Sequence, residues 1–356
     1  MTRHRWQFFL RAGEAWEAMY VDCAAARSSI DFEQYIMRDD DCGRRFTDLL
    51  AEKARAAVRV RLLCDMLGSH DFYNSEVPDR MRAAGCDVRF YNPMSPWRIA
   101  RLPSWSRRDH RKMTLVDGAL AHIGGVCIDS TMSEWRDTHV RIAGPVGVEV
   151  GRAFERLWNH MDGRTQAAEL RPVGQEDFAF LTNEPHTRRN AIYRHVLAAI
   201  ARARHYIFLT TPYYVPDHRF FRHLRRACRR GVDVRLLMPN HPDHPIVDKV
   251  SRSYWGPALK AGIRIFAYEP TMIHAKTIVI DDRWATVGSS NLDYLSFFRN
   301  QEGNLIVTKR AFALDLKHQF LEDLESAREV SLEEWRNRPF TDKIAGLIGR
   351  PIKKFL

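Results

Sequence analysis

The chain has 356 residues, of which 45% are hydrophobic and 28% are charged, and its formal net charge is +11. The length exceeds the ~100–200 residues of a usual domain, so we expect two domains or one duplicated unit with a sizeable core. No stretch approaches the ~18 apolar residues of a membrane span, and residues 1–14 lack the apolar segment of a secretory signal. The basic excess indicates an anionic partner, namely nucleic acid, acidic lipid or a phosphorylated substrate, or else only a solvated basic face.

The cysteines are scattered along the chain and form no Cys-x-x-Cys pair. This spacing argues against a disulfide framework and against a zinc site, and it favours reduced thiols in the cytosol. The six cysteines are Cys23, Cys42, Cys64, Cys86, Cys127 and Cys228.

Short apolar strands alternate with helical patterns, and their order repeats once along the chain. In the first half we expect strands at residues 29–37, 58–63 and 87–91, with a helix ending at Ala84-Gly85. The second half repeats this order with strands at 206–213, 232–237 and 263–268 and a helix ending at Ala261-Gly262. Strands rich in Val, Ile and Leu between helices predict an α/β fold, with a buried parallel or mixed sheet in each half.

The repeat sets the expected domains. We expect an N-terminal half at residues 1–170, a C-terminal half at 171–330 and a basic amphipathic tail at 331–356. The join falls within residues 144–188, where the Pro, Gly, Gln and Glu content near 171–176 suggests a linker.

Each half contains one His-x-Lys-x4-Asp motif, and a glycine follows each histidine at the same spacing. One such motif could arise by chance, but two copies at corresponding positions of a repeat are hard to explain that way. The second copy continues from Gly288 into Ser289 and Asn291, whereas Cys127 replaces the asparagine in the first copy. The motif residues are His110, Lys112 and Asp117 in the first half, and His274, Lys276 and Asp281 in the second.

The residue types of the motif suit phosphodiester chemistry. Histidine and lysine two positions apart in a strand point to the same face, so both should line one pocket. Lysine binds phosphate oxygens as a point charge, and histidine can serve as nucleophile, acid or base near neutral pH. Ser289 and Asn291 could donate hydrogen bonds to the charge that develops.

A catalytic histidine needs an orienting partner on its second ring nitrogen. Asp137 and Glu302 each follow a motif in a plausible returning strand, so we propose them as these partners. Asp117 and Asp281 are better placed to anchor the turn after each strand, although they belong to the motif.

These residues resemble the phospholipase D superfamily, whose signature His-x-Lys-x4-Asp-x6-Gly-Ser-x-Asn occurs twice. The resemblance runs from about Gln7 to Asp323, and within the superfamily the chain is most similar to bacterial cardiolipin synthases of the short type without membrane spans. It is carried by the motifs and by three further segments, 109–118, 135–139 and 211–216. The resemblance implies two similar phospholipase D-like α/β units, related by a pseudo-two-fold axis, with the active site at their interface.

The resemblance also implies the reaction. Phosphatidylglycerol would be donor and acceptor, and cardiolipin would form by metal-free phosphatidyl transfer through a phosphohistidine, without a cofactor. His110 would be the nucleophile and His274 the acid and base, a division that the symmetric motifs leave open. Lys112 and Lys276 would hold the phosphate. Because Cys127 replaces an amide, phosphate contact in the first half should be weaker.

Two segments could contact an anionic membrane surface. Residues 92–109 contain Trp97, Arg98, Trp105 and Arg107, a combination that suits the lipid headgroup layer. The tail places apolar residues at helical spacing among lysines and arginines, as in an interfacial helix. In both places the apolar side chains could instead pack on the core. We expect a cytoplasmic protein, peripheral on the inner face of the cell membrane, with no nucleic acid partner.

Three alternatives remain open from the sequence. A hydrolase would use water instead of a lipid alcohol through the same intermediate. A nuclease of the same superfamily would explain the positive charge, with steep salt dependence. A non-catalytic lipid-binding scaffold is the third alternative, although both motifs are intact. The acceptor alcohol, the acyl-chain preference, the oligomeric state and any activating partner are not set by the sequence.

Overall fold

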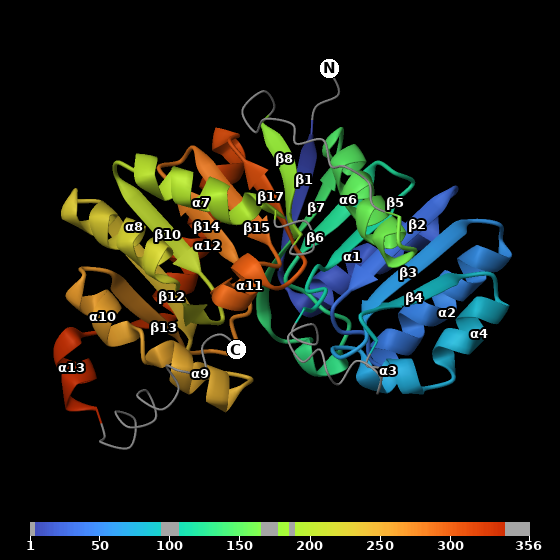
Figure 1. Ribbon diagram of the computed structural model, residues 1–356, viewed down its shortest axis with the longest axis horizontal. Coiled ribbons are helices and arrows are strands. Elements are labelled where there is room, and N and C mark those ends of the chain that lie inside the picture. The colour runs from blue at the N-terminus through green and yellow to red at the C-terminus, as the bar shows by residue number, and fades with distance from the viewer. Residues whose placement is uncertain (1–3, 94–106, 165–176, 185–188, 339–356) are drawn as a thin grey trace.

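The computed structural model describes residues 4–93, 107–164, 177–184 and 189–338. It contains two large mixed sheets, one from each half of the chain, which lie side by side (Figure 1). A small parallel sheet joins β11 (Tyr214–Val215) and β16 (Leu292–Asp293). The first sheet has seven strands in the order β4 (Asp87–Tyr91), β3 (Arg59–Asp65), β2 (Ser29–Gln34), β5 (Met113–Val116), β6 (Leu120–Gly124), β7 (Arg136–Ala143) and β1 (Arg5–Arg11).

The second sheet repeats this order and adds one strand at each edge. Its nine strands are β18 (Ala327–Val330), β13 (Arg264–Tyr268), β12 (Asp233–Pro239), β10 (Tyr206–Thr210), β14 (Thr277–Ile280), β15 (Trp284–Gly288), β17 (Glu302–Val307), β8 (Phe178–Glu184) and β9 (Arg189–Asn190). In each sheet three parallel strands adjoin an antiparallel meander. The predicted α/β class and the repeat are therefore confirmed. The strands expected at 29–37 and 206–213 end earlier, at Gln34 and Thr210.

Helices cover the outer face of each sheet and also lie between the two sheets. On the first half the outer helices are α1 (Ala12–Ala25), α2 (Asp41–Arg55), α3 (His70–Asn74) and α4 (Val77–Ala83). On the second half they are α7 (Ala191–Arg202), α8 (His218–Arg229), α9 (Pro245–Arg252), α10 (Trp255–Lys260), α11 (Tyr294–Phe298) and α13 (Leu332–Asn337). None of the helices among the described residues is long and apolar enough to cross a bilayer.

The expected helix ends at Ala84-Gly85 and Ala261-Gly262 are present. Gly85 and Gly262 have φ angles of +100° and +91°, in the left-handed region that residues with a Cβ rarely adopt. Each glycine ends its helix and turns the chain into the following strand, β4 or β13. The two halves thus share the same turn chemistry at corresponding positions.

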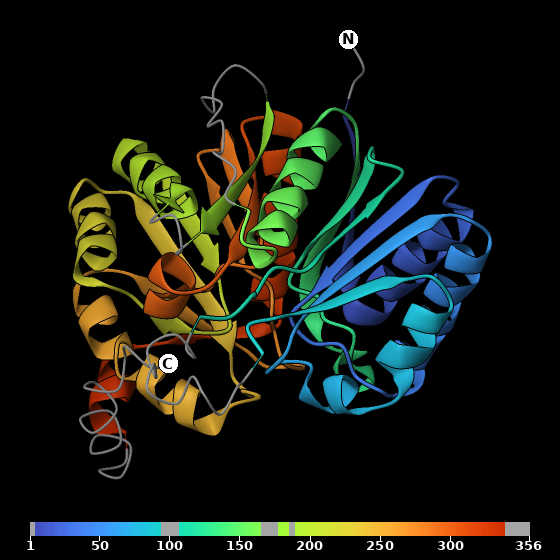
Figure 2. The ribbon, with the colours of Figure 1, turned by 45° about the vertical axis from the view of Figure 1, so that its right-hand side comes forward.

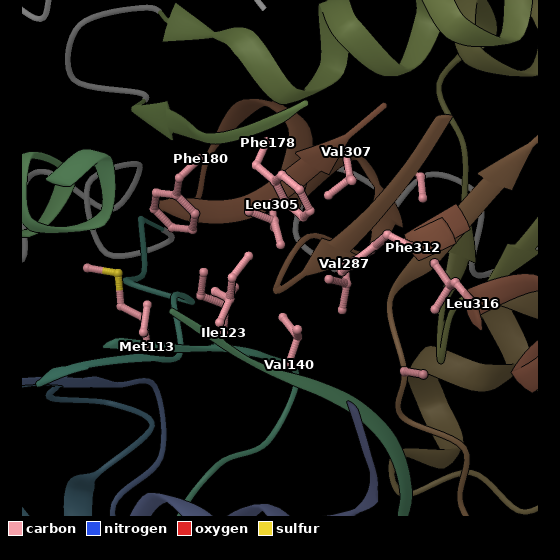
Figure 3. Packing of buried hydrophobic residues seen from close by; sticks show 14 of the residues in the cluster. Met113, Ile123, Val140, Phe178, Phe180, Val287, Leu305, Val307, Phe312 and Leu316 are labelled. Carbon is pink, nitrogen blue, oxygen red and sulfur yellow. The ribbon is translucent and has the colours of Figure 1, made fainter. Parts of the chain in front are cut away.

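The two halves share one hydrophobic core. The helices α6 (Val146–Met161) and α12 (Arg310–Glu325) contribute to this core together with residues of both sheets (Figure 3). Met113, Ile123 and Val140 of the first half lie in the same cluster as Phe180 and Leu305 of the second. Because apolar surface of each half is buried in this shared cluster, the interface is part of the folding core and holds the halves in a fixed relation. Figure 2 shows α6 beside the strands of the second half.

Candidate active site

The first motif enters β5 from the edge that faces the second half. Asp109 forms an isolated parallel bridge with Gln301, and the His110 backbone N–H donates to the Gln301 carbonyl at 3.0 Å. The second motif repeats this arrangement: Ile273 bridges Arg136, and the His274 N–H donates to the Arg136 carbonyl at 2.7 Å. Each histidine segment is therefore held by the half to which it does not belong.

These bridges place the histidines and lysines just before β5 and β14 rather than inside them. The expectation that each motif histidine and lysine lie within a strand is therefore wrong. The reason is that the motif backbone leaves the pairing of its own sheet to bond with the opposite half. His110 and Lys112 still lie on one side of the segment, with the Lys112 ammonium donating to the His110 carbonyl at 2.6 Å.

Each motif histidine is paired with the carboxylate of the other half. His110 Nδ1 lies 3.1 Å from Glu302 Oε1, and His274 Nδ1 lies 2.9 Å from Asp137 Oδ2. The sequence predicts both carboxylates as partners but does not say which histidine each one binds. In the structure each carboxylate binds the motif histidine of the other half. In each ring Nε2 is left for the reaction, and an Nδ1–H donated to a carboxylate fixes that tautomer.

The motif glycines make this pairing sterically possible. A Cβ at Gly124 would lie 2.7 Å from the Thr138 carbonyl oxygen, and one at Gly288 would lie 2.3 Å from the Gly303 carbonyl oxygen. A Cβ at Gly125 would lie 2.5 Å from the Asp137 carboxylate. Only glycine therefore lets the strands that carry Asp137 and Glu302 approach this closely.

Ser289 stands where the first half has Gly125, and it supports Glu302. Its hydroxyl donates to the Glu302 carboxylate and accepts from the Gly303 N–H at 3.0 Å. Ser289 thus supports Glu302 in this structure, and its donation to the substrate stays a prediction. Asn291 is buried, and its side-chain oxygen has no hydrogen-bond partner among the described residues.

The two carboxylates differ in their electrostatics. Burial is the largest influence on Glu302, and it raises the pKa of this carboxyl to about 7. Burial also raises the pKa of Asp137, but the hydrogen bond from His274, the nearby charges and the Thr138 N–H outweigh it and lower that pKa to about 2. Asp137 is thus ionised at neutral pH, whereas Glu302 titrates there.

Both histidines are pushed toward the neutral form. Burial, followed by the charges of Lys112 and Lys276, lowers the pKa of His110 well below its usual value. Burial and Lys276 lower the pKa of His274, while the Asp137 carboxylate partly restores it. Both imidazoles are therefore favoured in the neutral form, and the Asp137 carboxylate supports the protonated form of His274.

Both motif lysines lie close enough to His110 to influence its pKa, and neither forms an ion pair with a described residue. Each is only 2% exposed, and each donates to the carbonyl of its own motif histidine. No carboxylate lies within ion-pair distance of either ammonium among the described residues. Burial, and then repulsion by Lys112, lowers the pKa of Lys276 to about 7, although Asp137 opposes this. Buried cations without counter-ions are costly, so the site is built to receive an anion.

Two rings that the sequence analysis missed line the site. Tyr35 packs edge-on against His110 at 4.7 Å between ring centroids and lies 4.9 Å from the Lys112 ammonium. Trp135 packs edge-on against His274 at 5.5 Å. Two signals in the sequence could have indicated Trp135: it lies two residues before Asp137, and it opens the segment 135–139 that carries the family resemblance.

Asp117 and Asp281 lie at the opposite ends of β5 and β14 from the histidines. Asp117 accepts hydrogen bonds from the backbone N–H groups of residues 27–29, and Asp281 accepts from those of residues 204–206. Both residues have positive φ angles, as a tight turn requires. The turn-anchor interpretation is confirmed, and grouping these two with the catalytic residues is corrected.

Of the residues expected at a membrane, only Arg107 is described, and it is exposed. Trp97, Arg98 and Trp105 lie outside the described residues, as do the linker at 171–176 and most of the amphipathic tail. Within the described ranges, we find no group of three or more His, Cys, Asp or Glu side chains arranged to hold a metal ion.

A buried charged cluster supports the first motif from behind. Arg111 Nε lies 2.8 Å from Glu33 Oε1 and 3.5 Å from Asp109 Oδ1, and all three side chains are at most 1% exposed. Burial raises the pKa of Glu33 well above its usual range, and the pKa of Asp109 is raised as well. This cluster was not anticipated from the sequence, although the two carboxylates within β2, Asp31 and Glu33, were a visible signal.

The second half lacks the cluster. Ile273 and Ala275 replace Asp109 and Arg111, and the register places Thr210 where β2 has Glu33. Arg111→Met should therefore lower the free energy of unfolding by about 3–5 kcal/mol, because it leaves Asp109 buried without a counter-charge. Chemical denaturation would measure this loss.

A matched variant tests that reason. Glu33→Thr/Asp109→Ile/Arg111→Ala copies the second half and removes all the charges together, so it should lose less stability than Arg111→Met. If the triple variant is the less stable of the two, burial of an uncompensated charge is not the cause.

Comparison with known proteins places this geometry in a family. Residues 196–324 match the family model described as cardiolipin synthase, PLD-like domain. The chain is 33% identical to a cardiolipin synthase of Geobacillus kaustophilus over 96% of its own length and 70% of the relative. It is 31% identical to the major cardiolipin synthase ClsA of Bacillus subtilis, over 96% and 73%.

Solved structures share the fold. A phosphatidylserine synthase of Haemophilus influenzae superimposes with a TM-score of 0.75 at 12% identity, over 99% of this chain and 95% of that one. A polyphosphate kinase of Porphyromonas gingivalis does so with a TM-score of 0.64 at 13% identity, over 99% and 53%. The predicted fold and the predicted family are confirmed: this chain belongs to the cardiolipin synthase family of phospholipase D-like proteins.

Proposed function

We propose that this protein is a phosphatidyltransferase that makes cardiolipin from two molecules of phosphatidylglycerol through a phosphatidyl-histidine intermediate. The observation that supports this most strongly is the crossed pairing of His110 with Glu302 and of His274 with Asp137 around two buried lysines. That arrangement supplies a nucleophile, an acid and an anion site from two halves at one place. The names of the relatives support the choice of lipid.

In the first step His110 Nε2 attacks phosphorus, and a P–N bond forms as the P–O bond to glycerol breaks. His274 gives its Nε2 proton to the departing glycerol oxygen. In the second step a hydroxyl of another phosphatidylglycerol loses its proton to His274 and attacks phosphorus. The P–N bond then breaks, cardiolipin leaves, and both imidazoles return to their starting forms.

The lysines and the carboxylates have separate tasks in this scheme. Lys112 and Lys276 hold the non-bridging oxygens, and binding of that anion favours their charged forms. Asp137 stabilises the imidazolium of His274 in the proton-carrying state. Glu302, when ionised, accepts the Nδ1–H of His110 and so leaves the lone pair on Nε2. This asymmetry supports His110 as the nucleophile.

The reaction would take place at an anionic membrane surface, with a phospholipid as the partner. The Trp- and Arg-containing segment directly before the first motif supports a peripheral position beside lipid headgroups. We infer the inner face of the cell membrane as its location.

Product analysis tests the proposed function. Incubation with phosphatidylglycerol alone should give cardiolipin and glycerol in equal amounts, measured by mass spectrometry. Phosphatidic acid as the main product would instead identify a hydrolase. Cleavage of single-stranded DNA without lipid turnover would identify a nuclease.

The raised pKa of Glu302 gives the reaction a pH dependence. Below about pH 6 the protonated carboxyl can donate to His110 Nδ1, which places the ring proton on Nε2 and blocks attack. The rate, measured as kcat at saturating phosphatidylglycerol, where the bound phosphate favours the charged lysines, should therefore rise as pH passes through about 7, where Glu302 loses its proton. Glu302→Gln keeps an acceptor for Nδ1–H but cannot titrate, so its profile should lose this rise.

Asp137→Asn is the matched comparison. Asp137 is ionised far below this range, so the change should lower the rate at every pH without removing the rise. A rise that persists in Glu302→Gln would show that another group controls it.

A further inference from the structure

A second concentration of positive charge lies on the second half, outside the catalytic residues. Helix α8 carries exposed arginines along most of its length, and its C-terminal part forms one wall of a cavity of about 580 Å³ with α10 and α13. We call this cavity the basic groove. Its charged lining residues are Arg225, Arg229, Lys260, Arg336 and Arg338.

The cations of the basic groove are not neutralised. No carboxylate lines the cavity, and Arg225, Arg229 and Lys260 form no ion pair with any described residue. Nearby arginines outside the groove behave differently. Arg264 pairs with Glu329 at 2.7 Å and Arg328 pairs with Glu334 at 2.8 Å. Positive charge is therefore unpaired in the groove, whereas on the surrounding surface it is paired with carboxylates.

The groove also has a fixed aromatic wall. Trp335 lies against Trp255 at 5.3 Å between ring centroids, and the Arg338 guanidinium lies 4.2 Å above the Trp335 ring. A Cβ at Gly256 would lie 2.9 Å from Trp335 Nε1, so the indole is seated closely on α10. Phe221, Pro257 and Leu332 complete the apolar lining.

This combination fits the headgroup layer of an anionic bilayer. Phosphate oxygens can take the unpaired cations, and a tryptophan beside them suits the depth at which headgroups meet acyl chains. The sequence that follows Arg338 agrees, because it is the basic segment with Phe340, Ile344 and Leu347 at helical spacing. A groove for single-stranded nucleic acid typically presents a row of rings on which successive bases stack, whereas the lining of this groove offers Phe221 and Trp335.

We propose that the basic groove docks this protein on a membrane by binding the phosphates of anionic phospholipid headgroups. This surface is distinct from the active site, and binding there does not require the proposed reaction. The groove would attach the second half to the membrane through its charge. This attachment is additional to any membrane contact made by residues 92–109 of the first half.

Vesicle partitioning of the full-length chain tests the proposal. Each cation near an anionic bilayer strengthens partitioning roughly fivefold at low salt, so Arg225→Gln/Arg229→Gln should weaken binding roughly 25-fold. The vesicles are phosphatidylcholine with and without phosphatidylglycerol, and the loss should occur only with phosphatidylglycerol. Arg55→Gln/Arg80→Gln is the control, because these exposed residues of α2 and α4 form no ion pair with described residues and their loss changes the net charge equally.

The outcomes separate this proposal from the catalytic one. Unchanged partitioning of the groove variant, or an equal loss in the control, overturns the docking role. Weakened binding of a single-stranded oligonucleotide with intact vesicle binding also overturns it. Both variants should turn over phosphatidylglycerol in detergent micelles at the wild-type rate. Vesicle binding without any cardiolipin formation would contradict the proposed reaction and leave the docking surface intact.

Discussion

His110→Ala should reduce cardiolipin formation by on the order of 10⁴-fold or more, with no covalent intermediate. The nucleophilic Nε2 has no substitute in this scheme, because the other site imidazole, His274, serves as the acid and base of both steps. The rate should be measured at saturating phosphatidylglycerol, since a lost nucleophile lowers kcat rather than binding. The lysines remain in place, so KM should change little.

The controls address folding and surface effects. His218→Ala, at the exposed start of α8, should keep the wild-type rate. The thermal midpoint of His110→Ala should stay close to that of the wild type at pH 6, where Glu302 is mostly protonated and loses no ion pair. Substantial residual turnover by a folded His110→Ala protein would contradict the assignment of the nucleophile.

Most of the architecture could be predicted from the sequence because the chain contains two copies of one structural repeat. Apolar strands, left-handed glycines and motif spacing recur at corresponding places, and each copy supports the interpretation of the other. The turn role of Asp117 and Asp281 was also predictable, since an aspartate directly after a strand can accept successive backbone N–H groups.

The crossed pairing could not be predicted in the same way. Asp137 and Glu302 follow the motifs of their own halves at nearly equal spacing, so the sequence does not distinguish pairing within a half from pairing between halves. Pairing between the halves is set by the bridges of Asp109 with Gln301 and of Ile273 with Arg136. These bridges form only when the two sheets pack on their shared core. Such contacts leave no periodic pattern in the chain.

The difference between the halves was equally hidden. Gly125 and Ser289 occupy the same motif position, but only the structure shows that one makes room for Asp137 and the other donates to Glu302. The shared His-x-Lys-x4-Asp pattern is thus held in unlike surroundings in the two halves. The local environment, rather than the motif itself, separates the roles of the two histidines.

That separation leads to the second large effect. His274→Ala should lower turnover of phosphatidylglycerol by roughly 10²–10⁴-fold, because glycerol must then leave without a proton and the acceptor must attack without a base. A phosphatidyl ester of p-nitrophenol removes the first of these difficulties, since p-nitrophenolate leaves without protonation. With this substrate, His274→Ala should release one p-nitrophenolate per protein in a burst and then stall.

The stalled protein should carry the phosphatidyl group on His110, as an acid-labile, alkali-stable adduct that peptide mass spectrometry can locate. His110→Ala should show no burst with the same substrate, because no P–N bond can form. The reverse result, with a burst in His110→Ala and a label on His274, would exchange the two roles. It would also mean that the ionised Asp137 supports a nucleophile and the titrating Glu302 supports an acid, against the electrostatics of the site. The experiment therefore tests whether unlike carboxylates are sufficient to direct a symmetric pair of motifs through an ordered reaction.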